Sequence, residues 1–406
     1  MGYAELKKKL KKQVQEGLDY GRDYTDEEVE EDIDRTLTDN PEIVLYTVEE
    51  RRQLKKEIFD SIRRLDVLQE FVDDSSVTEI MVNGLDDIFV EKNGRMTQQN
   101  VHFESLERLQ DVVQQIAAGC NRIVNEASPI VDARLSNGSR VNIVLNPVAL
   151  NGPIITIRRF PENPITAKQL VENQSISQEA IDFLKMLVQA KYNIFISGGT
   201  GSGKTTFLNV MSGFIPGDER VITIEDSAEL QIQGIRNLVR LETRNGNVEG
   251  CNEVGIRDLI RSSLRMRPDR IIVGEVRGAE AIDMLQAMNT GHDGSLSTGH
   301  ANSAVDMLSR LCNMVMTGME IPLGAIREQI ASGIDIIVHL GRLRDKSRKI
   351  LEISELDGCG ENGILLRQLF LFEERGQDKS GKIIGALERK MELRNQSKLR
   401  AAGLQL

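Results

Sequence analysis

Eight consecutive residues in the middle of the chain have the types and the spacing of a phosphate-binding loop. The segment Gly198–Thr205 reads Gly-Gly-Thr-Gly-Ser-Gly-Lys-Thr and fits the pattern G-x-x-x-x-G-K-[S/T]. Its glycines let successive backbone N–H groups turn toward one anion, and a helix N-terminus adds partial positive charge. In that arrangement Lys204 reaches the β- and γ-phosphates of a nucleotide, while the hydroxyl of Thr205 binds Mg²⁺. The predicted nucleotide-binding residues are Gly198, Gly199, Thr200, Gly201, Ser202, Gly203, Lys204, Thr205 and Thr206.

The sequence on either side of this loop favours the same interpretation. Asn193–Ser197 is short and apolar, as a buried strand is, and Thr206–Met211 has the pattern of a helix. A glycine-rich turn that binds no ligand is the alternative. Strand, loop and helix follow one another in the order that a P-loop requires, so we expect a P-loop NTPase that uses ATP and Mg²⁺.

Two carboxylates stand at the ends of apolar strands, where open α/β sheets bind their ligands. Glu275 follows such a strand in a Walker B pattern, although Gly274 occupies the usual Asp position. We expect Glu275 to polarise the attacking water or to hold Mg²⁺ through water, and capping of the next helix is the alternative. Glu225 and Asp226 follow the strand Val221–Ile224. Neighbours on a strand point to opposite faces, so at most one of them faces the phosphates, and we favour Glu225 as the catalytic or metal-side acid. The predicted metal-side residues are therefore Thr205, Glu225 and Glu275.

Histidines and arginines complete the set of residues that could act on a phosphoryl group. His292 and His300 flank a short strand, and a neutral imidazole can hydrogen-bond a phosphate or a water, although a structural role is the alternative. Arg140 and Arg158 are expected on the polar faces of two strands in an N-terminal domain. A guanidinium brought across a domain or subunit boundary would stabilise phosphoryl charge as an arginine finger, and ordinary surface charge is the alternative.

The elements that position these residues fall into four segments. We expect a helical, partly mobile N-terminal extension over residues 1–60, an α+β domain that supplies arginines over 61–163, an ATPase domain over 164–356 and a C-terminal extension over 357–406. Pro161 and Pro164 mark the linker before the ATPase domain. Within that domain apolar runs alternate with helical patterns, as in a parallel α/β sheet that closes with strands near 334–340 and 350–356.

The α+β domain has signals of its own. Hairpin turns are predicted at Asn93-Gly94 and Asn137-Gly138. Strands are expected near 77–82, 87–91, 141–145 and 155–158. One helical stripe is formed by Leu106, Leu109, Val112, Val113 and Ile116.

Composition limits the possible functions. The chain has 406 residues and a net charge of -11, which argues against a nucleic-acid-binding surface over the whole molecule. No apolar run is long enough to span a membrane, and the N-terminus has no apolar core typical of a secretory signal. Cys120, Cys251, Cys312 and Cys359 are scattered, as expected of reduced structural thiols. A lysine run at residues 7–12 is either a solvated helix face or a contact for an anionic lipid or an acidic partner.

Longer motifs resemble a known family. Arg267–Glu280 resembles the Walker B segment of the type II/IV secretion ATPase superfamily, Thr223–Asp226 its Asp box and His292–His300 its His box. Thr78–Gly84 and Thr156–Phe160 are similar to the CpaF-like branch, the motors of tight-adherence pili. The resemblance covers about residues 60–356.

The resemblance implies a RecA-like P-loop NTPase domain, preceded by a small α+β N-terminal domain and a helical N-terminal extension. It implies a cytoplasmic homohexamer at the inner face of the membrane, where ATP hydrolysis drives an inner-membrane platform protein of a pilus or secretion machine. In this family Glu275 would be the Walker B glutamate, Glu225 the Asp-box acid and His300 the His-box histidine. The finger candidates would be Arg140 and Arg158. Gly299 departs from the pattern, which has a bulkier apolar residue there, and we expect it to loosen the loop that carries His300.

Three functions stay open at this point. The first is an ATPase motor for pilus assembly or protein secretion, peripheral to the membrane through its partner. The second is a nucleic-acid-linked motor such as a conjugative-transfer ATPase, although the acidic charge and the lack of an aromatic–basic stripe argue against direct nucleic-acid binding. The third is a nucleotide-binding switch that is not a motor.

Overall fold

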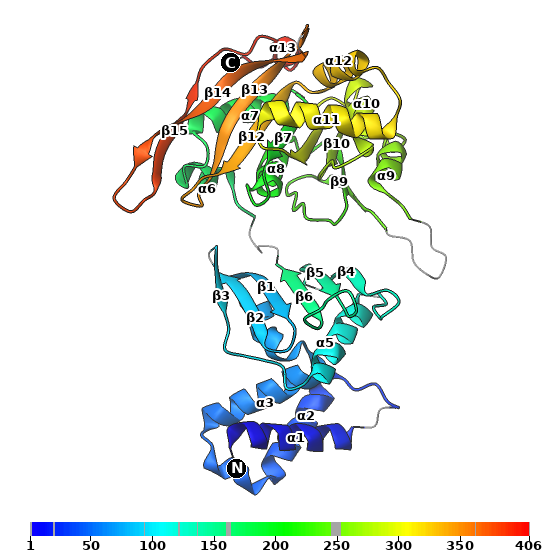
Figure 1. Cartoon of the computed structure of the whole chain (residues 1–406), viewed down its shortest axis with the longest axis vertical. Coiled ribbons are helices and arrows are strands. Elements are labelled where there is room, and N and C mark those ends of the chain that lie inside the picture. Colours follow the sequence, from blue (N-terminus) through cyan, green and yellow to red (C-terminus); the bar gives the residue numbers. More distant parts are fainter. Residues whose placement is uncertain are drawn as a thin grey trace. The chain divides into compact units, whose positions relative to one another are not determined.

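The computed structural model divides the chain into two compact units, unit 1 (Met1–Glu162) and unit 2 (Asn163–Leu406) (Figure 1). The described residues are 2–18, 21–92, 94–120, 122–135, 137–159, 164–244, 253–361 and 363–405. Four residues used in the predictions above lie outside them, namely Asn93, Phe160, Pro161 and Cys251.

Unit 1 begins with three helices, α1 (Tyr3–Gly17), α2 (Asp26–Asp39) and α3 (Val48–Arg63), with the 3-10 helix η1 (Pro41–Leu45) before the last. The predicted helical extension is thus confirmed. A threonine caps the N-terminus of α2 and of α3. In each case the threonine hydroxyl accepts the backbone N–H of a glutamate in the first turn, and the glutamate side chain accepts the backbone N–H of the threonine. The helices bury a common apolar cluster that includes Leu6, Leu10, Val29, Ile33, Leu54 and Ile58. This extension therefore has a small core of its own, which the sequence analysis did not predict.

The lysine run on α1 forms ion pairs inside unit 1. These are Lys7–Glu57 at 2.8 Å, Lys9–Glu42 at 3.0 Å and Lys11–Glu104 at 3.5 Å. Glutamates from elsewhere in unit 1 thus take up much of this positive charge, which favours the solvated-face interpretation over a lipid contact.

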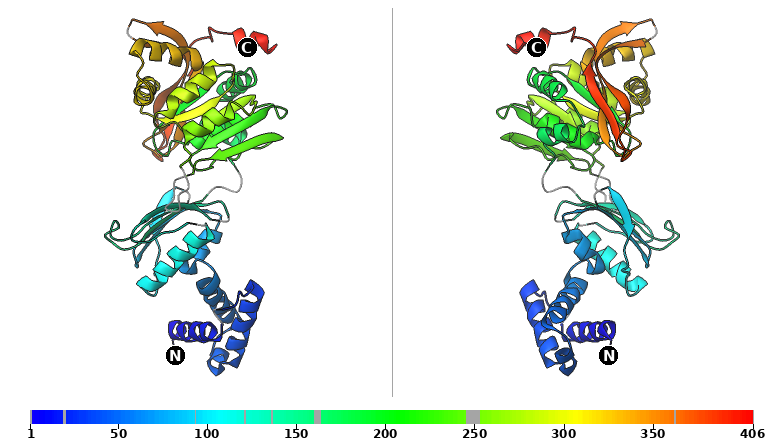
Figure 2. Two further views of the ribbon diagram at one scale, coloured as in Figure 1. Left: turned by 90° about the vertical axis from the view of Figure 1, so that its right-hand side faces the viewer. Right: turned by 90° about the vertical axis from the view of Figure 1, so that its left-hand side faces the viewer.

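The described part of unit 1 also holds six antiparallel strands in the order β3-β2-β1-β6-β5-β4. The elements are η2 (Asp66–Leu68), α4 (Gln69–Asp73), β1 (Val77–Asn83), β2 (Asp87–Lys92), β3 (Arg95–Gln98), α5 (Leu106–Gly119), β4 (Ile130–Arg134), β5 (Arg140–Val144) and β6 (Ile154–Arg158). Helix α5 packs on one face of the sheet through Leu109, Val112, Val113 and Ile116, and the predicted strands are confirmed (Figure 2). Leu106 is an exception to the predicted stripe: at the first turn it is 48% exposed.

Unit 2 is built on one sheet, in which nine described strands have the order β15-β14-β13-β12-β7-β11-β10-β8-β9. The strands are β7 (Ile194–Gly198), β8 (Arg220–Glu225), β9 (Asn237–Glu242), β10 (Arg270–Val273), β11 (Leu296–His300), β12 (Ile336–Arg342), β13 (Arg348–Gly360), β14 (Gly363–Gln377) and β15 (Ile383–Arg389). From β9 to β12 the pairing is parallel, as predicted. From β12 to β15 it is antiparallel, so the prediction of a parallel sheet is wrong for the strand near 350–356, and the predicted boundary near residue 356 falls inside β13.

Helices cover both faces of this sheet (Figure 2). They are α6 (Ala167–Glu172), α7 (Gln178–Gln189), α8 (Lys204–Ser212), α9 (Ile256–Ser263), α10 (Glu280–Asn289), α11 (Ala304–Gly318), α12 (Leu323–Gly333) and α13 (Ser397–Ala401). Ile194 and Ile196 on β7 pack in the cluster of α7 and α8, while Phe195 packs in the cluster of α9–α12. Burial on both faces explains why the β7 sequence is a continuous apolar run. Among the described residues, no helix combines the length and the apolar character needed to cross a bilayer.

Candidate active site

The predicted phosphate loop lies between β7 and α8. Strand β7 ends at Gly198 and α8 begins at Lys204, so Thr205 and Thr206 lie in the first helical turn. Gly203 precedes the helix with φ of 96°, a left-handed conformation that a residue with a side chain adopts only under strain. The glycine before the lysine is therefore required by the backbone path that turns the loop into the helix.

Lys204 and His300 meet over this loop. The Nζ atom of Lys204 donates hydrogen bonds to the carbonyls of Gly198 at 3.1 Å and Gly199 at 3.0 Å. It lies 3.3 Å from each ring nitrogen of His300, which ends the adjacent strand β11. Burial and the charge of Lys204 both lower the pKa of His300, so the ring is neutral at neutral pH. The structure thus brings together two residues that lie 96 positions apart in the sequence.

Glu275 completes this cluster. It follows β10, and its Oε1 atom lies 2.9 Å from Nε2 of His300. That contact lacks hydrogen-bond geometry, so among the described residues Oε1 of Glu275 is buried with no hydrogen-bond partner. Its other oxygen accepts a hydrogen bond from Nη2 of Arg277 at 2.8 Å, and Nη1 of Arg277 lies 3.5 Å from Oδ2 of Asp226. A carboxylate with one oxygen fixed by an arginine and the other beside a neutral imidazole is suited to orienting a water molecule.

Arg277 is a site residue that the sequence analysis missed. It lies within the Walker B segment, but an arginine two residues after a glutamate has no special meaning in an irregular segment, so the sequence predicts no role for it. In the structure the backbone N–H of Val276 donates a hydrogen bond of 2.9 Å to the carbonyl of Thr298 on β11. This bond holds the backbone between Glu275 and Arg277 against that strand. The two side chains can then pair.

Glu225 lies beside this cluster and explains the glycine in the Walker B segment. A Cβ atom at position 274 would lie 3.0 Å from Cγ of Glu225, so an Asp in place of Gly274 would force the side chain of Glu225 to shift. One oxygen of Glu225 accepts the backbone N–H groups of Glu229 at 2.6 Å and Leu230 at 2.8 Å. Glu225 thus holds the loop after β8, a role the sequence analysis did not foresee. Burial raises its pKa to about 7, although those hydrogen bonds oppose the shift.

The residues present fit a nucleotide with Mg²⁺. Oxygen atoms of Glu225 and Glu275 are buried without a hydrogen-bond partner in the described part of the chain, which leaves lone pairs for metal-bound water. Within the same residues no three His, Cys, Asp or Glu side chains gather as a metal cage. A P-loop magnesium does not need such a cage, because phosphates, water and one hydroxyl supply most of its ligands.

Two further predictions concern the strand that carries His300. His292 lies before the start of β11, at the end of the sheet opposite to the P-loop, and contacts the carbonyl of Ala287 at 3.3 Å. The expectation that Gly299 loosens the loop at His300 finds no support in the packing. A Cβ atom there would lie 2.9 Å from the thioether of Met307 and 3.1 Å from the ring of Phe195, so these side chains already fill the space. His300 itself is still paired within the strand ladder.

The predicted arginines lie in unit 1, on one row of its sheet. Arg134 pairs with Arg140 across β4 and β5, and Arg140 pairs with Arg158 across β5 and β6. Valine and isoleucine next to them point to the buried face, so the guanidinium groups belong to the face opposite α5. Arg158 has an acidic neighbour, Glu79, with Nε and Oε1 3.9 Å apart. Guanidinium groups are the side chains that most readily bind anions with planar oxygens, and this row places three of them on one face of the sheet.

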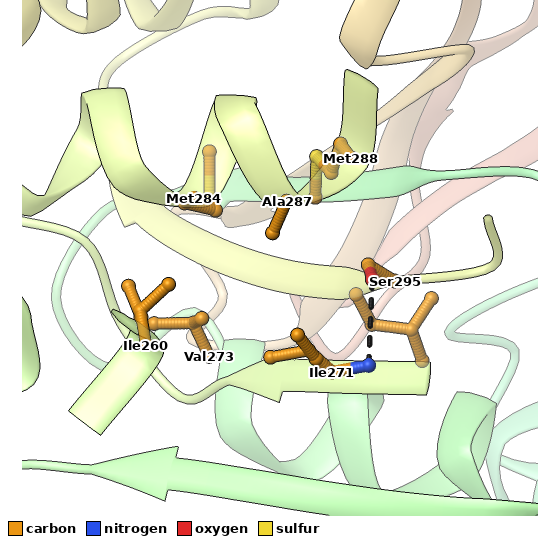
Figure 3. Close-up of a pocket in the computed structure, with 8 residues that line it drawn as sticks. Ile260, Ile271, Val273, Met284, Ala287, Met288 and Ser295 are labelled. Atoms are coloured by element: carbon orange, nitrogen blue, oxygen red, sulfur yellow. Dashed lines mark hydrogen bonds between the residues drawn. The ribbon is translucent and has the colours of Figure 1, made fainter. Parts of the chain in front are cut away.

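A small cavity lies elsewhere in unit 2, between α10 and strands β10 and β11 (Figure 3). Met284, Ala287 and Met288 face it from α10, and Ile271 and Val273 from β10. Its lining carries no charged side chain and includes no residue of the P-loop, Glu225 or Glu275, so we regard it as a packing gap.

The fold and the site together define a P-loop NTPase of the RecA-like class. The chain belongs to the type II/IV secretion system protein family, whose model matches residues 63–384. This confirms the superfamily resemblance and the fold class, while the CpaF-like branch stays a prediction.

Relatives support the same family. The chain is 32% identical over 320 residues to the type IV secretion system protein PtlH of Bordetella pertussis, covering 72% of this chain and 94% of PtlH. It is 32% identical over 314 residues to the conjugal transfer protein TrbB of Rhizobium radiobacter, covering 76% of this chain and 92% of TrbB. The crystal structure of the ATPase DotB of Legionella pneumophila is similar in fold, with 21% identity, a TM-score of 0.51 and coverage of 73% of this chain and 80% of DotB.

Proposed function

We propose that this chain is an ATP-hydrolysing motor that powers assembly of a type IV-like pilus or protein secretion across a membrane. The observation that carries the proposal is the meeting of Lys204, Glu275 and His300 at the P-loop, with contacts of 3.3 Å and 2.9 Å. A phosphate-binding lysine, a buried carboxylate oxygen without a partner and a neutral imidazole are the groups that phosphoryl transfer to water requires. Membership of the secretion family supports the coupling of this chemistry to transport.

Each residue then has a role in hydrolysis. The P-loop from Gly198 to Thr206 binds the phosphate chain, and Lys204 neutralises charge on the transferring group. Glu275 orients the attacking water and takes its proton, while Arg277 holds the carboxylate in place through its 2.8 Å hydrogen bond. His300, kept neutral, donates or accepts a hydrogen bond at the terminal phosphate. Thr205, Glu225 and Glu275 lie on the metal side, where Mg²⁺ would neutralise charge on the phosphates.

Arg140 and Arg158 would act as arginine fingers in a homohexamer. Their place beside one another, and beside Arg134, supports this role because one anion can meet more than one guanidinium there. In the domain division we propose, residues 61–163 supply these arginines to the ATPase domain of residues 164–356.

The proposed partner is an inner-membrane platform protein of the pilus or secretion machine. The chain would then work in the cytoplasm and lie at the inner face of the membrane through that partner, without direct contact with nucleic acid. The tight-adherence pilus is the specific machine that we favour, on the motifs shared with the CpaF-like branch.

ATP turnover by purified variants tests the proposal. Lys204→Ala should abolish nucleotide binding and turnover. Glu275→Gln should still bind ATP but hydrolyse it roughly 100- to 10,000-fold more slowly, because a general base contributes that much. The exposed residues Lys185 and Glu172 provide controls, and Lys185→Ala and Glu172→Gln should hydrolyse ATP like the parent chain. Undiminished turnover in Glu275→Gln would remove Glu275 from the mechanism, and tight ATP binding without any turnover in the parent chain would favour a nucleotide switch.

A second function, conjugative transfer, is supported by the similarity to the conjugal transfer protein TrbB. A motor that contacts DNA directly should hydrolyse ATP faster when single-stranded DNA is added. We expect no such stimulation, since the net charge of the chain is -11. A steep rise in turnover with DNA would favour this second function over the first.

A further inference from the structure

The hairpin of β12 and β13 approaches the P-loop from the side opposite to His300. Strand β7 lies between β11 and β12 in the sheet, and β12 runs parallel to it with Leu340 opposite Gly198. Gly341 and Arg342 therefore extend β12 past the end of β7, alongside the start of the phosphate loop. The chain then turns back into β13, whose first residue is Arg348.

Arg348 lies directly against the phosphate loop. Its Nε atom donates a hydrogen bond to the carbonyl of Gly201 at 2.9 Å, across 147 residues of sequence. Its Cδ atom lies 3.6 Å from the point that a Cβ atom on Gly203 would occupy. The stem of the arginine thus runs along the loop, and its charged end is exposed beside the loop's backbone.

The hairpin that carries Arg348 is fastened to other parts of unit 2. Its turn closes with a hydrogen bond from Leu343 N to Ser347 O of 2.8 Å, and Asp345 accepts the backbone N–H of Ile383 at the start of β15 at 2.8 Å. The next residue, Lys349, is buried and donates to the carbonyl of Gln174 at 2.7 Å. These contacts hold the backbone of Arg348 in place before any ligand binds, which lowers the entropy cost of using its side chain.

We propose that Arg348 binds the phosphate chain of a nucleoside di- or triphosphate held in the P-loop of the same subunit. This inference rests on the proposed function, because it presumes that the loop binds a nucleotide. It adds a cation that comes from the hairpin, independent of the arginines of unit 1.

The chemistry of the guanidinium supports this role. Arginine carries five N–H donors in a planar fork, and in the described structure the contact with Gly201 uses one of them. No other hydrogen bond or ion pair of Arg348 is found among the described residues. Arg344 on the same hairpin differs, because its guanidinium forms an ion pair with Glu374. Arg348 therefore has both the position and the open donors to meet an anion in the loop.

The competing interpretation is that Arg348 only braces the loop through Gly201. Substitutions separate the two, because glutamine can donate a hydrogen bond to a carbonyl but carries no charge. A brace should survive in Arg348→Gln, whereas a phosphate contact should be lost in Arg348→Gln and Arg348→Ala alike and partly restored in Arg348→Lys.

The test measures binding of fluorescent mant-ADP and the kinetics of ATP hydrolysis, using the full chain. We expect Arg348→Ala and Arg348→Gln to bind mant-ADP roughly 10- to 100-fold more weakly, the range for a lost hydrogen bond to a charged group. The KM for ATP should rise accordingly and kcat should change little, since the contact exists before the transition state. Arg344→Ala, which removes the same charge from the same hairpin, should bind like the parent chain.

Three outcomes would overturn the inference. Parent-like affinity in both Arg348→Ala and Arg348→Gln excludes the contact, while the proposed ATPase function stands if the parent chain binds mant-ADP. Parent-like affinity in Arg348→Gln alone reduces Arg348 to a brace. No binding of mant-ADP by the parent chain removes the proposed function and this inference together. Thermal unfolding of each variant identifies any affinity loss that comes from misfolding, and the glutamine and lysine variants then decide the question.

Discussion

The P-loop strand β7 has a neighbour on each side, and the two sides bring different side chains to the loop. On the side of β11 and β10 lie a carboxylate, an arginine and a neutral imidazole, those of Glu275, Arg277 and His300. On the side of β12 and β13 lie Arg348 and the buried His339. Under the proposed function, the first side (the acidic side) supplies the groups that act on a phosphoryl group and water. The second side (the hairpin side) supplies groups that hold the loop and its nucleotide. Changes on the first side should therefore lower turnover, and changes on the second should lower affinity or stability.

Among the substitutions that test the division between the two sides, Arg277→Ala should have the largest effect, a loss of turnover. Loss of the 2.8 Å hydrogen bond frees the carboxylate of Glu275 from its fixed orientation. We expect kcat for ATP hydrolysis to fall roughly 10- to 100-fold, as for other residues that orient a catalytic group, with little change in mant-ADP affinity. Steady-state phosphate release and mant-ADP binding measure the two quantities.

The control for this prediction is Arg265→Ala, which removes an equal charge from an exposed position away from Glu275. Arg277→Lys should recover part of the lost turnover, since an ammonium can still donate to the carboxylate. A loss of affinity with unchanged kcat in Arg277→Ala would contradict the division between the two sides, because the acidic side would then serve binding.

Gly274→Ala tests the acidic side through packing. The new methyl group would lie 3.0 Å from Cγ of Glu225 and 3.6 Å from the carbonyl of Ile224. Because both neighbours are buried, we expect the free energy of unfolding to fall by about 1–2 kcal/mol and turnover to fall with it. Urea unfolding measures the first quantity. The control is Gly324→Ala, which should not destabilise the chain because nothing lies within 4 Å of the added atom. Equal stability of the two variants would show that the side chain of Glu225 moves aside at no cost in free energy.

On the acidic side, the sequence singles out Glu275 and His300 because both belong to contiguous motifs, whereas it indicates no role for Arg277. The P-loop, Glu275 and His300 each follow or end an apolar strand, and parallel strands place their carboxyl ends at one edge of a sheet. The hairpin side was missed because Arg348 meets Gly201 across 147 residues and His339 meets Ser197 across 142. Those contacts depend on β12 lying next to β7, and the order of strands in space does not follow their order in the chain.

Glu225 illustrates a second limit. Alternation along the strand predicted correctly that Glu225 and Asp226 differ in environment, since Glu225 is 3% exposed and Asp226 is exposed. It could not predict that one carboxylate oxygen would turn to the amides of Glu229 and Leu230, because that contact depends on the path of the loop after β8. The N-terminal helices were predicted, but their shared core was not, because pairing of amphipathic faces is a tertiary property.

His339 on β12 is the buried member of the hairpin side. Its Nδ1 atom lies 3.1 Å from the hydroxyl of Ser197, the residue before the P-loop. Burial lowers the pKa of His339 from its ordinary value of 6.5, which keeps the ring neutral and able to accept from Ser197. His339 thus links β12 to the residue that precedes the P-loop.

Compared with Arg277→Ala and Gly274→Ala, His339→Gln should have the smallest effect. It should alter the pH dependence of the free energy of unfolding. Because the folded chain favours the neutral ring, the unfolded chain binds more protons as the pH falls below about 6.5, and the free energy of unfolding of the parent chain falls with it. Glutamine does not titrate, so the stability advantage of the parent chain over His339→Gln should be largest near pH 8 and should shrink toward pH 5. Urea unfolding between pH 5 and pH 8 measures this difference in the free energy of unfolding. His300 titrates in both proteins, so its contribution cancels in the difference. Parallel pH curves for the two proteins would mean that His339 is not held neutral beside Ser197, and the hairpin side would then contact the loop through Arg348 without this buried link.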